Sequence, residues 1–139
     1  METIVVGVDG SAGSIAALRW AIDEARLRGA KVRALSAWSY PPVSTYHQAE
    51  HVMKVPYADD AAAMLERAVA EAVGEDSGVE IETEVVESPA PHALVEAAKG
   101  ASLLVVGSRG LGGFSGLLLG SVSQQAAHHS PCPLVIVHE

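Results

Sequence analysis

Short apolar runs alternate with segments of helical period along this chain, and this alternation limits the folds open to it. The predicted strands are residues 4–8, 31–37, 79–87, 102–106 and 134–137. The predicted helices are the segment from Ser11 or Ser14 to about Arg28, and residues 57–73, 92–99 and 122–129. Strict strand–helix alternation favours a mainly parallel sheet with right-handed crossovers and helices on both faces.

Residues 38–56 are the least regular part of the sequence. Prolines, histidines and tyrosines occur there without a helical or strand period, so we expect a long loop. At 139 residues, the chain is long enough to bury its own core and is expected to form a single domain over residues 1–139.

The composition excludes several classes of protein. No apolar run approaches the roughly 20 residues of a membrane span, and the first ten residues lack the basic start of a signal peptide. Cys132 is the only cysteine, which excludes an intrachain disulfide framework. We therefore expect a cytoplasmic protein without a membrane partner. A formal net charge of −8 opposes binding to a nucleic-acid backbone, which requires a basic face.

The stretch GSRGLGGFSGLLLGSVS, residues 107–123, carries six glycines between a predicted strand and a predicted helix. The free N–H groups and the dipole of a helix N-terminus attract anions, and bare glycines let the backbone approach a ribose or phosphate. No lysine follows Lys99, which excludes a Walker P-loop, and Val8-Asp9-Gly10-Ser11 replaces the dinucleotide fingerprint after the first strand. If the first and fourth strands are neighbours where the strand order reverses, both loops face one crevice.

The glycine spacing is more specific than the glycine content. Gly107, Gly110 and Gly120, followed by Ser121, form G-x2-G-x9-G-[S/T], which resembles the nucleotide-binding signature of the universal stress protein family. The resemblance covers the whole chain, from Val8-Asp9-Gly10-Ser11 to the closing Cys132-Pro133-Leu134-Val135-Ile136-Val137. It implies a three-layer αβα, Rossmann-like fold similar to the adenine nucleotide alpha hydrolases. Its doubly wound parallel sheet has five strands in the order 3-2-1-4-5, with four helices.

The resemblance also implies ATP binding, because this chain keeps the glycines that the non-binding branch of the family lacks. Asp9 is then expected near the ribose and phosphates, where it can bind Mg²⁺ or Mn²⁺ through the phosphates, and the backbone of Ala37 is expected to contact adenine. The expected ATP-binding residues are Asp9, Gly10, Ala37, Gly107, Ser108, Arg109, Gly110, Gly112, Gly113, Gly120, Ser121, Val122 and Ser123. In this family the last strand commonly pairs with its copy in a homodimer. The expected interface residues are Leu134, Val135, Ile136 and Val137.

Structural interpretations of the same residues stay open. Asp9 can cap the first turn of a helix, and Ser121 or Ser123 can be plain N-caps. The sequence offers no nucleophile–base pair and no metalloprotease or hydrolase motif. Three functions compete: an ATP-binding stress regulator, a slow metal-dependent ATPase that uses Asp9 and Arg109, and a dimeric interaction scaffold in which ATP is structural.

Overall fold

The computed structural model describes residues 1–39, 57–74, 78–109 and 120–138. The elements are β1 (Thr3–Gly7), α1 (Ala12–Arg28), β2 (Lys31–Trp38), α3 (Tyr57–Val73), β3 (Ile81–Glu87), α4 (Ala90–Ala98), β4 (Leu103–Gly107), α5 (Ser121–His129) and β5 (Leu134–Val137). Their order confirms the alternation of strands and helices predicted from the sequence. Among the described helices, none is long and apolar enough to cross a membrane.

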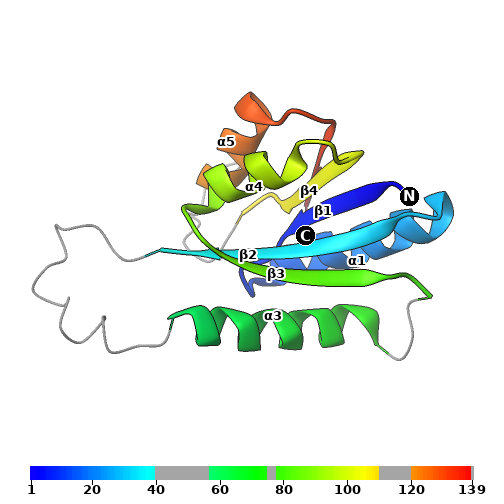
Figure 1. Ribbon diagram of the computed structural model, residues 1–139, viewed down its shortest axis with the longest axis horizontal. Coiled ribbons are helices and arrows are strands. Elements are labelled where there is room, and N and C mark those ends of the chain that lie inside the picture. Colours follow the sequence, from blue (N-terminus) through cyan, green and yellow to red (C-terminus); the bar gives the residue numbers. More distant parts are fainter. Residues whose placement is uncertain (40–56, 75–77, 110–119, 139) are drawn as a thin grey trace, which may run out of the picture.

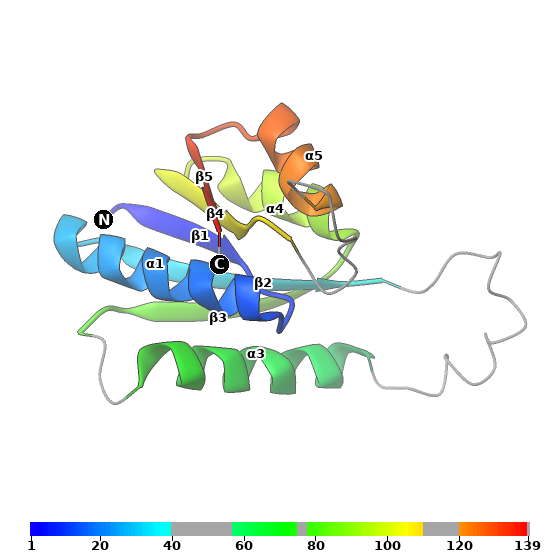
Figure 2. The ribbon, with the colours of Figure 1, turned by 180° about the vertical axis from the view of Figure 1, so that it is seen from behind.

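Five parallel strands form one sheet in the order β3-β2-β1-β4-β5, which confirms the predicted doubly wound fold. Helices α1 and α3 cover one face of the sheet, and α4 and α5 cover the other (Figure 1). Figure 2 shows the first of these faces, with α1 in front of the strands. Strand β1 is central, and the chain adds β2 and β3 on one side of it before it adds β4 and β5 on the other. Ligands of such sheets bind beyond the carboxyl ends of the strands at this reversal.

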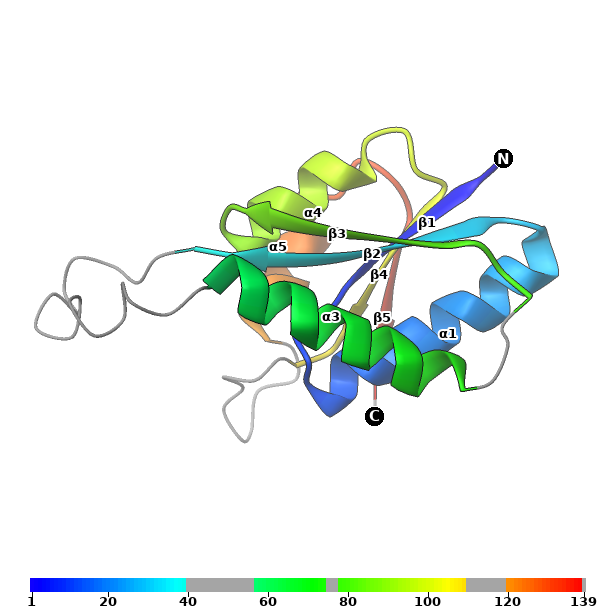
Figure 3. The ribbon, with the colours of Figure 1, turned by 60° about the horizontal axis from the view of Figure 1, so that its bottom comes forward.

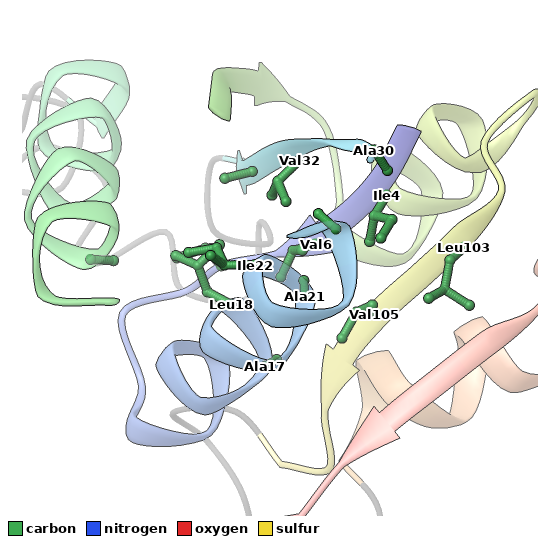
Figure 4. Close-up of a cluster of buried hydrophobic side chains, with 14 of the residues drawn as sticks. Ile4, Val6, Ala17, Leu18, Ala21, Ile22, Ala30, Val32, Leu103 and Val105 are labelled. Atoms are coloured by element: carbon green, nitrogen blue, oxygen red, sulfur yellow. The ribbon is translucent and has the colours of Figure 1, made fainter. Parts of the chain in front are cut away.

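Strand β1 is buried on both faces of the sheet, which explains why its sequence is a continuous apolar run. Ile4, Val6 and Val8 of β1 and its exit pack with Leu18 of α1 in the cluster on the α1 and α3 face (Figure 4). Val5 points to the opposite face and belongs to the cluster beneath α4 and α5. Because successive side chains of a strand point to opposite faces, a strand that is covered on both faces must be apolar throughout.

Some element boundaries differ from the prediction. Helix α4 begins at Ala90 instead of residue 92, because Pro89 serves as N-cap and a proline in the first turn loses no helical hydrogen bond. Strand β2 extends to Trp38, whose carbonyl accepts a 2.8 Å hydrogen bond from the Ser88 amide. Strand β3 begins at Ile81 instead of residue 79. The rest of the predicted loop, residues 40–56, lies outside the described residues.

Two ion pairs join β2 to the edge strand β3. The Lys31 ammonium lies 3.0 Å from a carboxylate oxygen of Glu82, and Arg33 pairs with Glu84. Both glutamate side chains are substantially exposed. Exposed pairs of this kind contribute little to stability, typically about 0–1 kcal/mol. Charged side chains also discourage an exposed strand from pairing with another chain, so β3 is a protected edge.

Candidate functional site

The site predicted from the sequence lies where β1 and β4 end side by side. The two strands pair in parallel, with Ile4 opposite Leu103 and Val6 opposite Val105. Their carboxyl ends therefore meet at one edge of the sheet, and the start of α1 lies next to the end of β4 there (Figure 3). The condition set by the sequence analysis, that the first and fourth strands are neighbours where the strand order reverses, is confirmed. The crevice itself stays a prediction, because residues 110–119 of the glycine stretch lie outside the described residues.

The turn after β1 is held by its own polar groups. Asp9 Oδ1 accepts a 2.9 Å hydrogen bond from the Ser11 amide, and Ser11 Oγ accepts a 3.1 Å hydrogen bond from the Ser14 amide. Ser11 is therefore the N-cap of α1, one of the two helix starts that the sequence left open, while Asp9 supports the turn before it. Gly10 joins the two with φ +86°, a left-handed conformation that favours glycine.

Helix α3 contacts this turn through Met64, a contact that sequence reasoning missed. A Cβ placed on Gly10 would lie 3.0 Å from Met64 Cγ and 3.3 Å from its sulfur. In the sequence Met64 looks like any other apolar residue on the inner face of a helix. Its role beside the turn depends on how α3 lies across the sheet, which no local pattern specifies.

Gly107, the last residue of β4, packs against the first turn of α1. A Cβ at this position would lie 2.8 Å from the carbonyl carbon of Gly13 and 2.9 Å from its oxygen. Cβ atoms almost never approach a backbone so closely, so a bare Cα is required for β4 and α1 to meet. The contact gives Gly107 a packing role. Its predicted approach to a ribose or phosphate stays a prediction.

Ser108 joins three elements at the base of the glycine stretch. Its amide donates a 2.9 Å hydrogen bond to the carbonyl of Val137 at the end of β5. Its own carbonyl accepts hydrogen bonds from the Gly120 amide at 2.6 Å and from Ser123 Oγ at 3.0 Å. The end of β4, the start of α5 and the end of β5 therefore meet at one residue.

The start of α5 differs from both simple capping interpretations. Its N-cap is Gly120, with no side-chain cap hydrogen bond, and Ser121 is an exposed first helical residue. The Ser123 side chain is buried. Val122 is half-buried and packs beside the cluster under α4 and α5.

The remaining predicted residues fall at the same edge or outside the described ranges. Arg109 is exposed and directly follows Ser108. Ala37 is half-buried near the end of β2, two residues beyond Leu35, whose carbonyl accepts a 2.9 Å hydrogen bond from the Val8 amide. The predicted residues that lie outside the described ranges are Gly110, Gly112 and Gly113.

The sequence matches a known family over nearly all of its length. The profile of the universal stress protein family matches residues 1–138. A universal stress protein of Mycolicibacterium smegmatis is 35% identical over 140 residues, which cover 97% of this chain and 47% of the relative. Universal stress protein Rv2624c of Mycobacterium tuberculosis is 34% identical over 139 residues, 99% of this chain and 48% of the relative. The chain thus spans about half the length of these curated relatives.

Solved structures agree with this match. Universal stress protein UspA from Lactobacillus plantarum has a TM-score of 0.82 at 22% identity, covering 98% of this chain and 97% of that one, and supports the fold. A universal stress protein solved in complex with cAMP has a TM-score of 0.63 at 32% identity, covering 99% of this chain and 96% of that one. By its profile match and its curated relatives, the chain belongs to the universal stress protein family.

Proposed function

We propose that this chain binds ATP at the carboxyl ends of β1 and β4. The observation that carries the proposal is the contact between Gly107 and Gly13, because it holds the turn at Asp9 next to the junction at Ser108. A family member that is 32% identical was solved with cAMP, which is itself an adenine nucleotide, and this supports a nucleotide as the ligand.

The first turn of α5 is the proposed phosphate cradle. The first amides of a helix lack helical partners, and the helix dipole favours negative charge beside them. At α5 the N-cap is Gly120, which has no side chain to accept hydrogen bonds from these amides. We propose that the backbone amides of Ser121 and Val122 bind the phosphates and that the exposed Arg109 neutralises part of the phosphate charge. The residues assigned by sequence position alone are Gly110, Gly112 and Gly113.

Asp9 is the proposed protein ligand for Mg²⁺ or Mn²⁺. The described residues contain no group of three or more histidine, cysteine, aspartate or glutamate side chains that could hold a metal ion. A divalent cation at Asp9 would then take most of its ligands from phosphate oxygens and water, which is the usual manner of Mg²⁺. Asp9 and the neighbouring Gly10 would face the ribose and phosphates, while the backbone of Ala37 would contact adenine.

We further propose that nucleotide occupancy regulates the chain in a stress response, through its conformation, its dimer state or its choice of partner. The proposed unit is one domain over residues 1–139 that acts in the cytoplasm. Because the curated relatives are about twice as long, the proposal concerns this domain and not the activity of a longer protein.

Thermal unfolding tests the proposed ligand. ATP with Mg²⁺ is expected to raise the melting temperature, because a ligand that binds only the folded state stabilises it. At a free concentration 100 times Kd the gain is about 2.7 kcal/mol, or roughly 8 °C for a domain of this size. Adenosine is the control, and its shift should be much smaller because it lacks the phosphates assigned to α5. Equal shifts with both ligands, or none with millimolar ATP, would refute the assignment.

Strand β5 is the proposed homodimer edge. It pairs with β4 on one side and lies at the end of the sheet. The carbonyls of Pro133 and Val137 accept hydrogen bonds from Leu104 and Ser108, so these odd-numbered residues direct their backbone groups toward β4. Backbone groups alternate in direction along a strand. The N–H and C=O groups of Leu134 and Ile136 therefore point to the free edge, where a second copy can pair with them.

Replacing Ile136 separates backbone pairing from side-chain loss. Ile136→Pro removes an N–H on the free edge, where proline is tolerated in strands, and is expected to convert a dimer to a monomer. Ile136→Ala removes most of the same side chain but keeps the N–H, so it should stay dimeric. Sedimentation velocity of the three proteins measures the outcome. A monomeric wild type, or a dimeric proline variant, would argue against pairing through β5.

A further inference from the structure

We propose that Ser123 is a positioning residue of the nucleotide site, whose hydroxyl holds the first turn of α5 against the end of β4. The family resemblance had placed Ser123 among the expected ATP-binding residues, and a plain N-cap role was the alternative. The inference rests on the proposed function, because it concerns how the same site is kept in shape.

The Ser123 hydroxyl is committed to the protein interior. The residue is only 2% exposed, and its Oγ lies 3.0 Å from the carbonyl oxygen of Ser108 and 3.0 Å from that of Gly120. A serine hydroxyl has one proton to donate. A phosphate oxygen accepts hydrogen bonds, so binding it would require the proton that these two carbonyls already share.

Ser108 provides a fixed point for this contact. Its amide is bonded to Val137 of β5, which ties the residue to the sheet, and the preceding Gly107 packs on the backbone of Gly13. The carbonyl of Ser108 therefore has a defined position relative to the turn at Asp9. A group that is hydrogen-bonded to this carbonyl is therefore also held in place relative to that turn.

The start of α5 depends on Ser123 because it lacks an ordinary cap. Gly120 has no side chain to accept hydrogen bonds from the first turn. Its own amide donates to Ser108 at 2.6 Å, and Ser123 reaches back to bond both Ser108 and Gly120. One side chain in the first turn thus fastens the N-cap residue to β4. The amides of Ser121 and Val122, the proposed phosphate donors, lie between the fastened residues.

Two measurements on Ser123→Ala test this role. Hydrogen exchange of the Gly120 amide, followed without nucleotide, should become about 3- to 10-fold faster, since the variant loses one net hydrogen bond at this joint. The Kd for ATP with Mg²⁺, measured by calorimetry, should rise by about the same factor. Ser123→Thr keeps the hydroxyl and should return both quantities toward their wild-type values.

Ser130→Ala is the matched control at the other end of α5. Ser130 Oγ also donates to a backbone carbonyl, that of Cys132 at 2.8 Å, so this variant loses a similar bond. It should alter neither the exchange of Gly120 nor the Kd for ATP. If Ser123→Ala acts only by destabilising α5, both alanine variants should change Gly120 exchange and the Kd for ATP to the same extent. That result would overturn the proposal.

The remaining outcomes separate this proposal from the proposed function. If Ser123→Ala weakens ATP binding without changing Gly120 exchange, the hydroxyl is a direct ligand and the positioning role is wrong. If exchange rises while the Kd stays at its wild-type value, the contact is structural only and the proposal also fails. If wild-type protein binds no adenine nucleotide, the proposed function fails, and a positioning role for Ser123 in that site fails with it.

Discussion

Gly107→Ala is expected to destabilise the fold by about 2–3 kcal/mol, because the new methyl group would overlap the backbone of Gly13. At 2.8 and 2.9 Å from carbonyl atoms of α1, the added Cβ cannot be accommodated by a side-chain rotation. Either α1 or the end of β4 must shift. The turn at Asp9 and Gly10 directly precedes α1, and Arg109 lies just beyond the end of β4, so ATP affinity should fall together with stability.

Urea unfolding measures this prediction, with Gly29→Ala as the control. Gly29 caps the end of α1 at φ +68°, with no atom within 4 Å of an added Cβ. Alanine there is expected to cost about 1–2 kcal/mol through backbone strain alone and to leave ATP binding unchanged. Gly107 has no such positive φ, so its cost comes from the clash. A Gly107→Ala variant as stable as the wild type would show that β4 and α1 do not meet as described.

Asp9 is expected to give the second large effect, on ligand affinity. Asp9→Asn removes the negative charge but keeps a side-chain oxygen that can accept the Ser11 amide, so stability should change by less than about 0.5 kcal/mol. The affinity for ATP with Mg²⁺ should fall about 10- to 100-fold, the range expected for losing a charge-assisted contact. Without Mg²⁺ the two proteins should bind ATP more nearly alike.

Asp9→Ala completes the comparison because it also removes the acceptor in the turn. It should lose the same affinity as the asparagine variant and, in addition, about 1 kcal/mol of stability. Calorimetry and urea unfolding separate the two effects. If Asp9→Asn binds ATP with Mg²⁺ as tightly as the wild type, the carboxylate serves only the turn, which was the structural alternative suggested by the sequence.

Local sequence patterns predicted the strands and helices, because a strand that is buried on both faces of the sheet must consist of apolar residues. Strand β1 had to be apolar throughout, and Gly29 supplied the left-handed residue that ends α1. The strand order came from the family resemblance and not from periodicity, since no local pattern states which strands pair. The early start of α4 was not predicted, because prolines such as Pro89 and Pro91 occur both in turns and in the first turn of a helix.

The sequence identified candidate residues after the first and fourth strands but did not predict the contacts that these residues make. Gly107 and Ser123 were both assigned to the ligand, yet their described contacts are with Gly13 and Ser108. These contacts join residues far apart in the sequence or depend on which way a side chain turns, so spacing alone could not reveal them. Met64 was missed for the same reason, because its contact with Gly10 depends on how α3 crosses the sheet.

Equilibrium dialysis of the wild-type chain with labelled ATP and Mg²⁺ tests whether this edge of the sheet binds ATP. We expect saturable binding of one ATP per chain, competed by unlabelled ATP and strongly weakened in Asp9→Asn. Absence of saturable binding at millimolar ATP with Mg²⁺ would contradict the assignment of this edge of the sheet as an ATP site.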